Sequence, residues 1–104
     1  MLFRRKSAVA EWLEYILDDF GDIEIRAEDY HLMDLSGPGY AIPSEEGNEA
    51  VSLMAREEGI FLDPVYTGKA FAGLLKMAKE GAFRGTENIL FLHSGGAGGL
   101  FAVM

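Results

Sequence analysis

Residues 60–96 read IFLDPVYTGKAFAGLLKMAKEGAFRGTENILFLHSGG, and this stretch decides the fold. It begins with a short apolar run at 60–62, which is typical of a strand buried on both faces. Thr67 is a candidate cap for a helix that runs to about Glu80 with its large apolar residues at helical spacing, and a second apolar run follows at 89–92. The order strand, helix, strand predicts two parallel strands joined by a right-handed crossover, and therefore an α/β fold.

Upstream of this stretch the sequence predicts a further helix with a loop before it. Ser44 precedes two glutamates, which is typical of an N-cap followed by acidic residues at the positive helix end, and the helix should end at Gly59. The glycines and proline of residues 36–39 indicate a loop. Nearer the N-terminus, the apolar spacing predicts a helix over residues 7–20 and one or two short strands between residues 23 and 34.

Polar side chains gather where the two predicted strands end. In an α/β sheet the ligand crevice lies at the carboxyl ends of the strands, so residues 65–68 and 93–96 should lie side by side. Tyr66 and Thr67 offer two hydroxyls in the first segment, and Ser94 offers one in the second. This convergence of polar groups is typical of a small-ligand site.

Three other patterns are weaker signals. The glycine run at 95–99 matches neither a Walker loop nor a dinucleotide-binding fingerprint, so a phosphate-binding loop and an ordinary strand-to-helix turn both stay open. His31 and His93 have no companion at metal-ligand spacing, and we expect no metal site. The glutamate pairs at 45–46 and 57–58 point about 100° apart on a helix, which fits solvated helix faces better than catalytic pairs.

The composition limits the class of protein. The chain has 104 residues, 49% of them hydrophobic, which suits one small domain with a single core. A net charge of -8 makes nucleic acid an unexpected partner, although the basic triplet Arg4–Lys6 leaves a nucleic-acid or membrane contact of that end open. The chain has no cysteine, which excludes disulfides and fits a reducing compartment such as the cytoplasm. No apolar run reaches the roughly 20 residues of a membrane helix, so we expect a soluble protein.

Three motifs carry a resemblance to a known family. They are GPGYAIPSEEG at 37–47, EGIFLDPVYTGKAFAGL at 58–74 and NILFLHSGG at 88–96. In order and spacing they resemble the C-terminal third of the D-cysteine desulfhydrase and 1-aminocyclopropane-1-carboxylate deaminase family, among the fold-type II pyridoxal-phosphate enzymes related to tryptophan synthase β. The resemblance implies one domain over residues 1–104, with residues 1–6 as a leader outside the family. The implied fold is a partial three-layer sandwich with a short, mainly parallel sheet and flanking helices.

The resemblance also implies roles for five residues. Tyr40 and Tyr66 would be active-site tyrosines that face the substrate, positioning its carboxylate or taking part in proton transfer. Thr67 and Ser94 would hold the pyridine nitrogen of pyridoxal 5'-phosphate, with Ser94 in place of the threonine that relatives commonly carry, and Gly95 would let the backbone come close. Thr67 stands where the deaminases carry a glutamate, whereas the desulfhydrase-like members read VYTGK as this chain does. A hydroxyl keeps the ring nitrogen protonated much less than a carboxylate does, which disfavours opening of a cyclopropane ring.

The function implied by the resemblance is that of the C-terminal portion of a pyridoxal-phosphate-dependent lyase. It would catalyse β-elimination from a small D-amino acid such as D-cysteine, releasing pyruvate, ammonia and sulfide. The alternatives are a fragment of a deaminase-like enzyme and a non-catalytic remnant that associates with itself. In the family the Schiff-base lysine lies upstream of the residues present here, and Lys69 is not expected to replace it. The chain alone should be inactive, and its expected partners are a small amino acid, a second copy or a missing N-terminal part.

Overall fold

The structure, a computed structural model, describes Glu11, Tyr15 and residues 26–102. The chain divides into two compact units, Met1–Asp34 and Leu35–Met104. A single domain over the whole chain therefore stays a prediction, and the residues with candidate chemistry all belong to the second unit.

In the first unit the structure describes η2 (Ala27–Asp29), a short 3-10 helix. The Arg26 N–H donates a hydrogen bond to the Asp29 carboxylate at 2.9 Å, which satisfies a backbone donor at the start of this turn. Residues 30–34 are in neither helix nor strand. The helix predicted over 7–20 lies outside the described residues except for two helical positions, and the predicted strand at 23–25 lies outside them entirely.

The second unit contains α2 (Glu45–Glu58), where the sequence predicts a helix. Ser44 is its N-cap, because the Ser44 Oγ accepts a hydrogen bond from the Gly47 N–H at 3.0 Å. Gly59 ends the helix in the left-handed conformation with a φ of 67°, and its N–H donates to the Ala55 carbonyl at 3.1 Å. Both predicted ends of this helix are confirmed.

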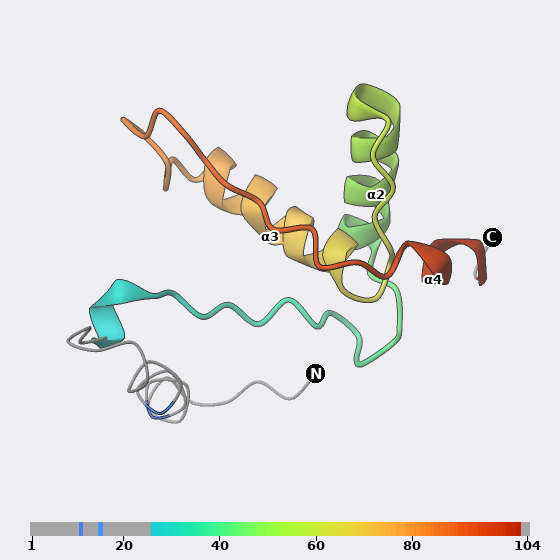
Figure 1. Ribbon diagram of the computed structural model, residues 1–104, viewed down its shortest axis with the longest axis horizontal. Helices are drawn as coiled ribbons and strands as arrows, with labels where there is room; N and C mark the ends of the chain where they lie inside the picture. Colours follow the sequence, from blue (N-terminus) through green and yellow to red (C-terminus); the bar gives the residue numbers. More distant parts are fainter. Residues whose placement is uncertain (1–10, 12–14, 16–25, 103–104) are drawn as a thin grey trace. The chain divides into compact units, whose positions relative to one another are not determined.

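Helix α3 (Thr67–Lys79) packs against α2 (Figure 1). The two helices approach closely because a glycine lies at their contact: a Cβ on Gly68 would lie 2.6 Å from the Val51 Cγ2 atom of α2. The sequence predicts the extent of α3, but Thr67 is not its N-cap. Tyr66 occupies that position without a side-chain capping bond, and Thr67 is the first helical residue. The cap comes instead from a residue further upstream, described with the site below.

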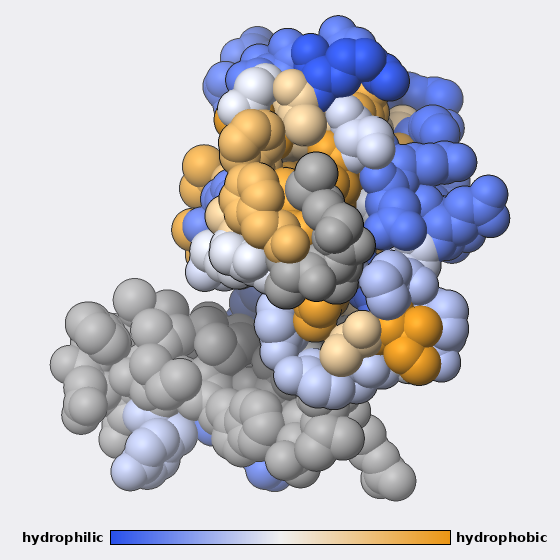
Figure 2. All heavy atoms as spheres, turned by 90° about the vertical axis from the view of Figure 1, so that its right-hand side faces the viewer, coloured by the Kyte–Doolittle hydropathy of each residue, from blue (hydrophilic) through white to orange (hydrophobic). Residues whose placement is uncertain are grey.

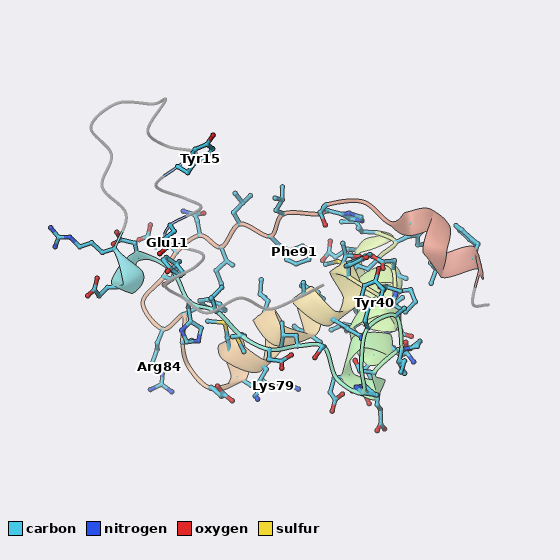
Figure 3. All side chains as sticks on the ribbon, turned by 90° about the horizontal axis from the view of Figure 1, so that it is seen from below. Glu11, Tyr15, Tyr40, Lys79, Arg84 and Phe91 are labelled. Carbon is cyan, nitrogen blue, oxygen red and sulfur yellow. The ribbon has the colours of Figure 1, made fainter. Side chains whose placement is uncertain are left out.

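Residues 86–96 run without helical turns alongside α3, and Phe91 points toward that helix (Figures 1 and 3). The ring of Phe91 packs edge-on against Phe71, with the ring centroids 5.3 Å apart. Leu90 and Leu92, the neighbours of Phe91 in sequence, are 93% and 80% exposed. Successive side chains therefore alternate between the helix and solvent, as they do on a β-strand.

The predicted sheet is not confirmed. Within residues 26–102 the structure contains no β-strand, although the sequence predicts strands at 60–62 and 89–92. No backbone hydrogen bond joins these two segments. A strand exists only through ladder bonds to a neighbour, so an apolar run with no neighbour in place remains an extended segment. The three-layer sandwich with its mainly parallel sheet therefore stays a prediction.

A last described helix, α4 (Ala97–Ala102), follows the extended segment. The glycine run forms a turn into a helix, and whether it also binds a phosphate stays open. Gly95 and Gly96 make the turn with φ angles of 108° and 85°, a conformation that favours glycine. Phe101 packs edge-on against Phe61 with ring centroids 6.3 Å apart, so α4 lies next to the residues that lead into α3.

The apolar core among the described residues is small. Its buried apolar side chains are Ala50, Val51 and Leu62. Figure 2 shows apolar surface on the face at the α4 side of Figure 1. The exposed large apolar residues of the second unit include Ile42, Ile60, Phe61, Ile89, Leu90, Leu92 and Phe101. Large exposed apolar patches are typical of interaction sites and ligand-binding grooves. None of the described helices has the length and apolar character that crossing a membrane requires.

Candidate functional site

Asp63 organises the start of α3. Its Oδ2 accepts hydrogen bonds from the N–H groups of Val65 and Tyr66, both at 2.8 Å, and its Oδ1 accepts the Thr67 N–H at 3.0 Å. The Asp63 carbonyl also accepts the Gly68 N–H at 2.8 Å. The first N–H groups of a helix have no partner inside the helix, and here one buried residue satisfies four backbone donors around that end.

The Asp63 carboxylate is ionised at neutral pH. The side chain is only 2% exposed. Burial raises the pKa of this carboxyl, but the hydrogen bonds from the Thr67 hydroxyl and from three backbone N–H groups lower it by more, so the pKa lies below its usual value of 3.8. The negative charge also lies at the positive end of α3, which is a favourable position.

The Thr67 hydroxyl is committed to Asp63. Its proton goes to Asp63 Oδ1 at 2.6 Å, and its oxygen accepts the Asp63 N–H at 2.9 Å. Because this bond uses the only proton of the hydroxyl, the Thr67 oxygen could take part in a further hydrogen bond only as an acceptor. The residue is also buried. In this arrangement Thr67 cannot donate a hydrogen bond to a pyridine nitrogen, and its role beside a cofactor stays a prediction.

Two tyrosines from distant parts of the chain meet beside this cap. The hydroxyl oxygens of Tyr40 and Tyr66 are 2.7 Å apart, and their rings make an edge contact with centroids 6.2 Å apart. Both side chains are exposed; Tyr40 is labelled in Figure 3. The hydrogen bond with Tyr40 raises the pKa of Tyr66 above 10.0, and burial and the charges of Tyr40 and Asp63 act in the same direction. Tyr66 is therefore a protonated phenol at neutral pH and can donate a hydrogen bond or a proton.

Tyr40→Phe should lower the pKa of Tyr66, because it removes the hydrogen bond that contributes most to the raised value. The measurement is a titration of phenolate ultraviolet absorbance against pH in the full chain. Tyr15→Phe is the matched control, since it also removes one of the four tyrosines but from an exposed position. The highest titration midpoint should fall in Tyr40→Phe and persist in Tyr15→Phe. An unchanged midpoint in Tyr40→Phe would contradict the pairing.

The loop that carries Ser94 lies against the same cap. His93 Nε2 bonds to the Phe61 carbonyl at 2.8 Å, and the Gly95 N–H donates to His93 Nδ1 at 3.1 Å. Because Nδ1 accepts and a carbonyl cannot donate, the proton of the ring is on Nε2. A Cβ on Gly96 would lie 2.7 Å from Asp63 Oδ1, which shows how closely the loop approaches the carboxylate. Ser94 itself is exposed, and within the described part of the chain its hydroxyl makes no hydrogen bond.

The structure thus brings together the two segments that the sequence predicts to be neighbours. Tyr66 and Thr67 lie at the start of α3, and the Ser94 loop reaches the same point through its contact with Asp63. Tyr40 joins them through Tyr66. The chemical roles assigned to these residues stay predictions.

Sequence reasoning missed Asp63. The available signal was an Asp-Pro pair just before a predicted helix, since an aspartate there can accept the unpaired N–H groups of the first turn. It also missed the bonds of Lys69, which is buried and donates from its ammonium to the carbonyls of Ser36 and Gly39. Among the described residues no group of three His, Asp or Glu side chains is arranged to hold a metal ion.

A family model described as pyridoxal-phosphate dependent enzyme matches residues 6–95. The chain belongs to this family. Members of the pyridoxal-phosphate dependent enzyme family bind pyridoxal phosphate, which when bound acts as an electron sink for the substrate carbon next to its amino group.

The residues of the site fit one side of this cofactor. Among the described residues the Ser94 hydroxyl has no partner, and a hydroxyl is a donor of the kind that a pyridine nitrogen accepts. Gly95 leaves open space, because a Cβ there would meet nothing within 4 Å. Lys69 does not fit the aldehyde side, since its ammonium is held by two backbone carbonyls and is buried. The hydroxyl of Ser94 and the space at Gly95 are chemically compatible with a pyridine ring. The role of each residue toward the cofactor stays a prediction.

Proposed function

We propose that this chain is the C-terminal portion of a lyase of the D-cysteine desulfhydrase type, acting with pyridoxal phosphate. The observation that carries the proposal is the Tyr40–Tyr66 pair, whose hydroxyl oxygens are 2.7 Å apart beside the Asp63 cap and the Ser94 loop. Two linked, exposed phenols next to the exposed hydroxyl of Ser94 suit a small, polar substrate.

The proposed reaction is β-elimination. The substrate loses the proton on its α carbon, the bond from the β carbon to sulfur breaks, and one water releases pyruvate and ammonia together with hydrogen sulfide. Tyr66 is protonated at neutral pH and can bind the substrate carboxylate or protonate the departing sulfur. Within the pair one phenol donates to the other, which leaves one O–H free for the substrate.

Thr67 supports the desulfhydrase type over the deaminase alternative. A hydroxyl at this position does not supply the carboxylate that strengthens the cofactor as an electron sink, and the Thr67 hydroxyl is already bonded to Asp63. Elimination of a good leaving group such as a thiol demands less of the cofactor than opening a cyclopropane ring.

The proposed site is completed by a further polypeptide that supplies the lysine for the cofactor. Leu90 and Leu92 are 93% and 80% exposed, as expected if this extended segment becomes a strand whose second face another part of an enzyme covers. A second copy of the chain is the alternative partner. The lack of cysteine in the sequence fits a reducing compartment, and the proposal includes a cytoplasmic location.

The test combines the chain with the upstream two thirds of a D-cysteine desulfhydrase and with pyridoxal phosphate. Size exclusion with light scattering should detect the complex, and sulfide and pyruvate should form from D-cysteine faster than from free cofactor. The chain without the upstream part should not exceed the free-cofactor rate. Tyr66→Phe should reduce the rate of the complex about 100-fold, the typical contribution of a general acid or base, whereas Tyr15→Phe should not.

Two results would contradict the proposal. Faster consumption of 1-aminocyclopropane-1-carboxylate than of D-cysteine would favour the deaminase alternative. A complex that forms, binds the cofactor and turns over neither substrate would favour a non-catalytic remnant.

A further inference from the structure

Lys69 carries a buried charge that the reaction does not use. The residue is 6% exposed, and its Nζ donates to the Ser36 carbonyl at 2.7 Å and to the Gly39 carbonyl at 3.1 Å. Burying an ammonium is unfavourable unless its protons find acceptors. Both acceptors here are backbone carbonyls of one loop, so the ammonium binds a particular loop conformation.

That loop, residues 36–41, takes a conformation that needs support. Gly37 and Gly39 have φ angles of 63° and 156°, and Ala41 has a φ of 61°. A residue with a Cβ in the left-handed region costs about 1 kcal/mol, and such strain persists only where surrounding contacts hold it. The Gly39 carbonyl accepts the Ile42 N–H at 3.2 Å as well as the Lys69 ammonium, so it is a fixed point of the loop.

We propose that Lys69 is a positioning residue, whose ammonium holds the 36–41 loop so that the Tyr40 hydroxyl meets the Tyr66 hydroxyl. Tyr40 directly follows Gly39, one of the two carbonyls that Lys69 binds. Tyr66 precedes Lys69 at the N-terminal end of the same helix, α3, so both members of the pair are placed relative to that helix. The importance of this for catalysis rests on the proposed function; the positioning itself does not.

A purely structural role for Lys69 has to be separated from positioning. The stem of Lys69 packs against α2, since a Cβ on Gly47 would lie 3.2 Å from the Lys69 Cγ. Removing the whole side chain would therefore disturb the helix contact as well as the loop. Lys69→Met keeps the stem and removes the ammonium.

The experiment is a phenolate titration of the full chain, followed by ultraviolet absorbance, in Lys69→Met, Tyr40→Phe and the double variant. Lys69→Met should lower the highest midpoint by the same amount as Tyr40→Phe, and the double variant should show no further shift. Lys76→Met is the matched control, because it removes an exposed lysine of the same helix, and it should leave the titration unchanged. Circular dichroism establishes that each variant is folded. A folded Lys69→Met with the wild-type titration would overturn the proposal.

A chemical rescue decides the matter if Lys69→Met does not fold. Lys69→Cys would contain a single cysteine, because the chain has none of its own. Alkylation in denaturant with bromoethylamine restores an ammonium at the original length, and bromopropane gives a neutral side chain of the same size. After refolding, only the ammonium adduct should recover the wild-type phenol titration. If the two adducts gave the same phenol titration, whether that of the wild type or that of the unfolded chain, the proposal would be overturned.

This titration needs neither cofactor nor substrate. A normal rescue together with an inactive complex would therefore contradict the proposed function and leave the positioning intact. A failed rescue together with an active complex would contradict the positioning by Lys69 and leave the proposed function intact.

Discussion

Asp63→Ala should lower the free energy of unfolding by about 3 kcal/mol, because bonds to a buried charged group contribute about 1.5–3 kcal/mol each and orphaned donors add a penalty. The substitution would leave the N–H groups of Val65, Tyr66 and Thr67 and the Thr67 hydroxyl without their acceptor. Asp63→Asn should be nearly as harmful, since the amide NH2 would face N–H donors in place of an oxygen. Urea denaturation followed by circular dichroism measures the loss.

Glu49→Ala is the control for this prediction. It also removes one carboxylate, but from an exposed position on α2, and should change stability by less than about 0.5 kcal/mol. A loss in Asp63→Ala no larger than in Glu49→Ala would show that the cap is unimportant.

The contribution of Asp63 should also depend on pH. Its pKa in the folded chain lies below the ordinary value of 3.8 because of the bonds from Thr67, Tyr66 and Val65, which outweigh burial. A lowered folded pKa means that the carboxylate stabilises the chain above 3.8 and that this stabilisation is lost as the pH falls through the folded pKa. Asp63→Asn should lose less stability than the wild type on acidification over this range.

Gly68→Ala should destabilise the chain by about 2–3 kcal/mol, the cost of overpacking where the neighbours cannot move freely. The new Cβ would lie 2.6 Å from the Asp63 carbonyl oxygen and 2.6 Å from Val51 Cγ2. The Asp63 carbonyl oxygen is a backbone atom that accepts the Gly68 N–H, so it cannot move without disturbing the cap. The clash would therefore push α3 away from α2 and lengthen the hydrogen bonds of the cap.

Gly98→Ala provides the matched control in α4. A Cβ there meets nothing within 4 Å, and alanine favours a helix, so the variant should be as stable as the wild type or more so. Thermal unfolding of the two variants compares them directly. Similar midpoints would show that the contact between α2 and α3 tolerates a wider spacing.

Local chemistry made two helices predictable. Ser44 and Gly59 predict the two ends of α2, and the apolar spacing of residues 67–79 predicts the extent of α3. For helix α4 the sequence offered only a possible turn into a helix, because the glycines inside it disfavour a helix. Phe101 of α4 packs against Phe61, a contact between distant residues that local propensity does not encode. Propensity alone could not establish the sheet, because a strand needs backbone hydrogen bonds to a neighbouring strand. Among the described residues no such pair of strands is formed.

The site was predictable in part for similar reasons. The topological argument brought Tyr66, Thr67 and Ser94 to one region, but Tyr40 came only from the family motif, since it lies 26 residues from its partner. The Lys69 bonds span 33 and 30 residues, and no local pattern encodes a side chain that binds distant carbonyls. Asp63 was within reach of local reasoning, because its partners follow it directly in the sequence.

The imidazole of His93 has a consequence for Ser94. Nδ1 receives the Gly95 N–H while Nε2 binds the Phe61 carbonyl, so the ring spans the residues on both sides of the serine and the segment before α3. Through these two bonds the imidazole fixes the backbone on both sides of Ser94 relative to Phe61, and so sets where the Ser94 hydroxyl is presented.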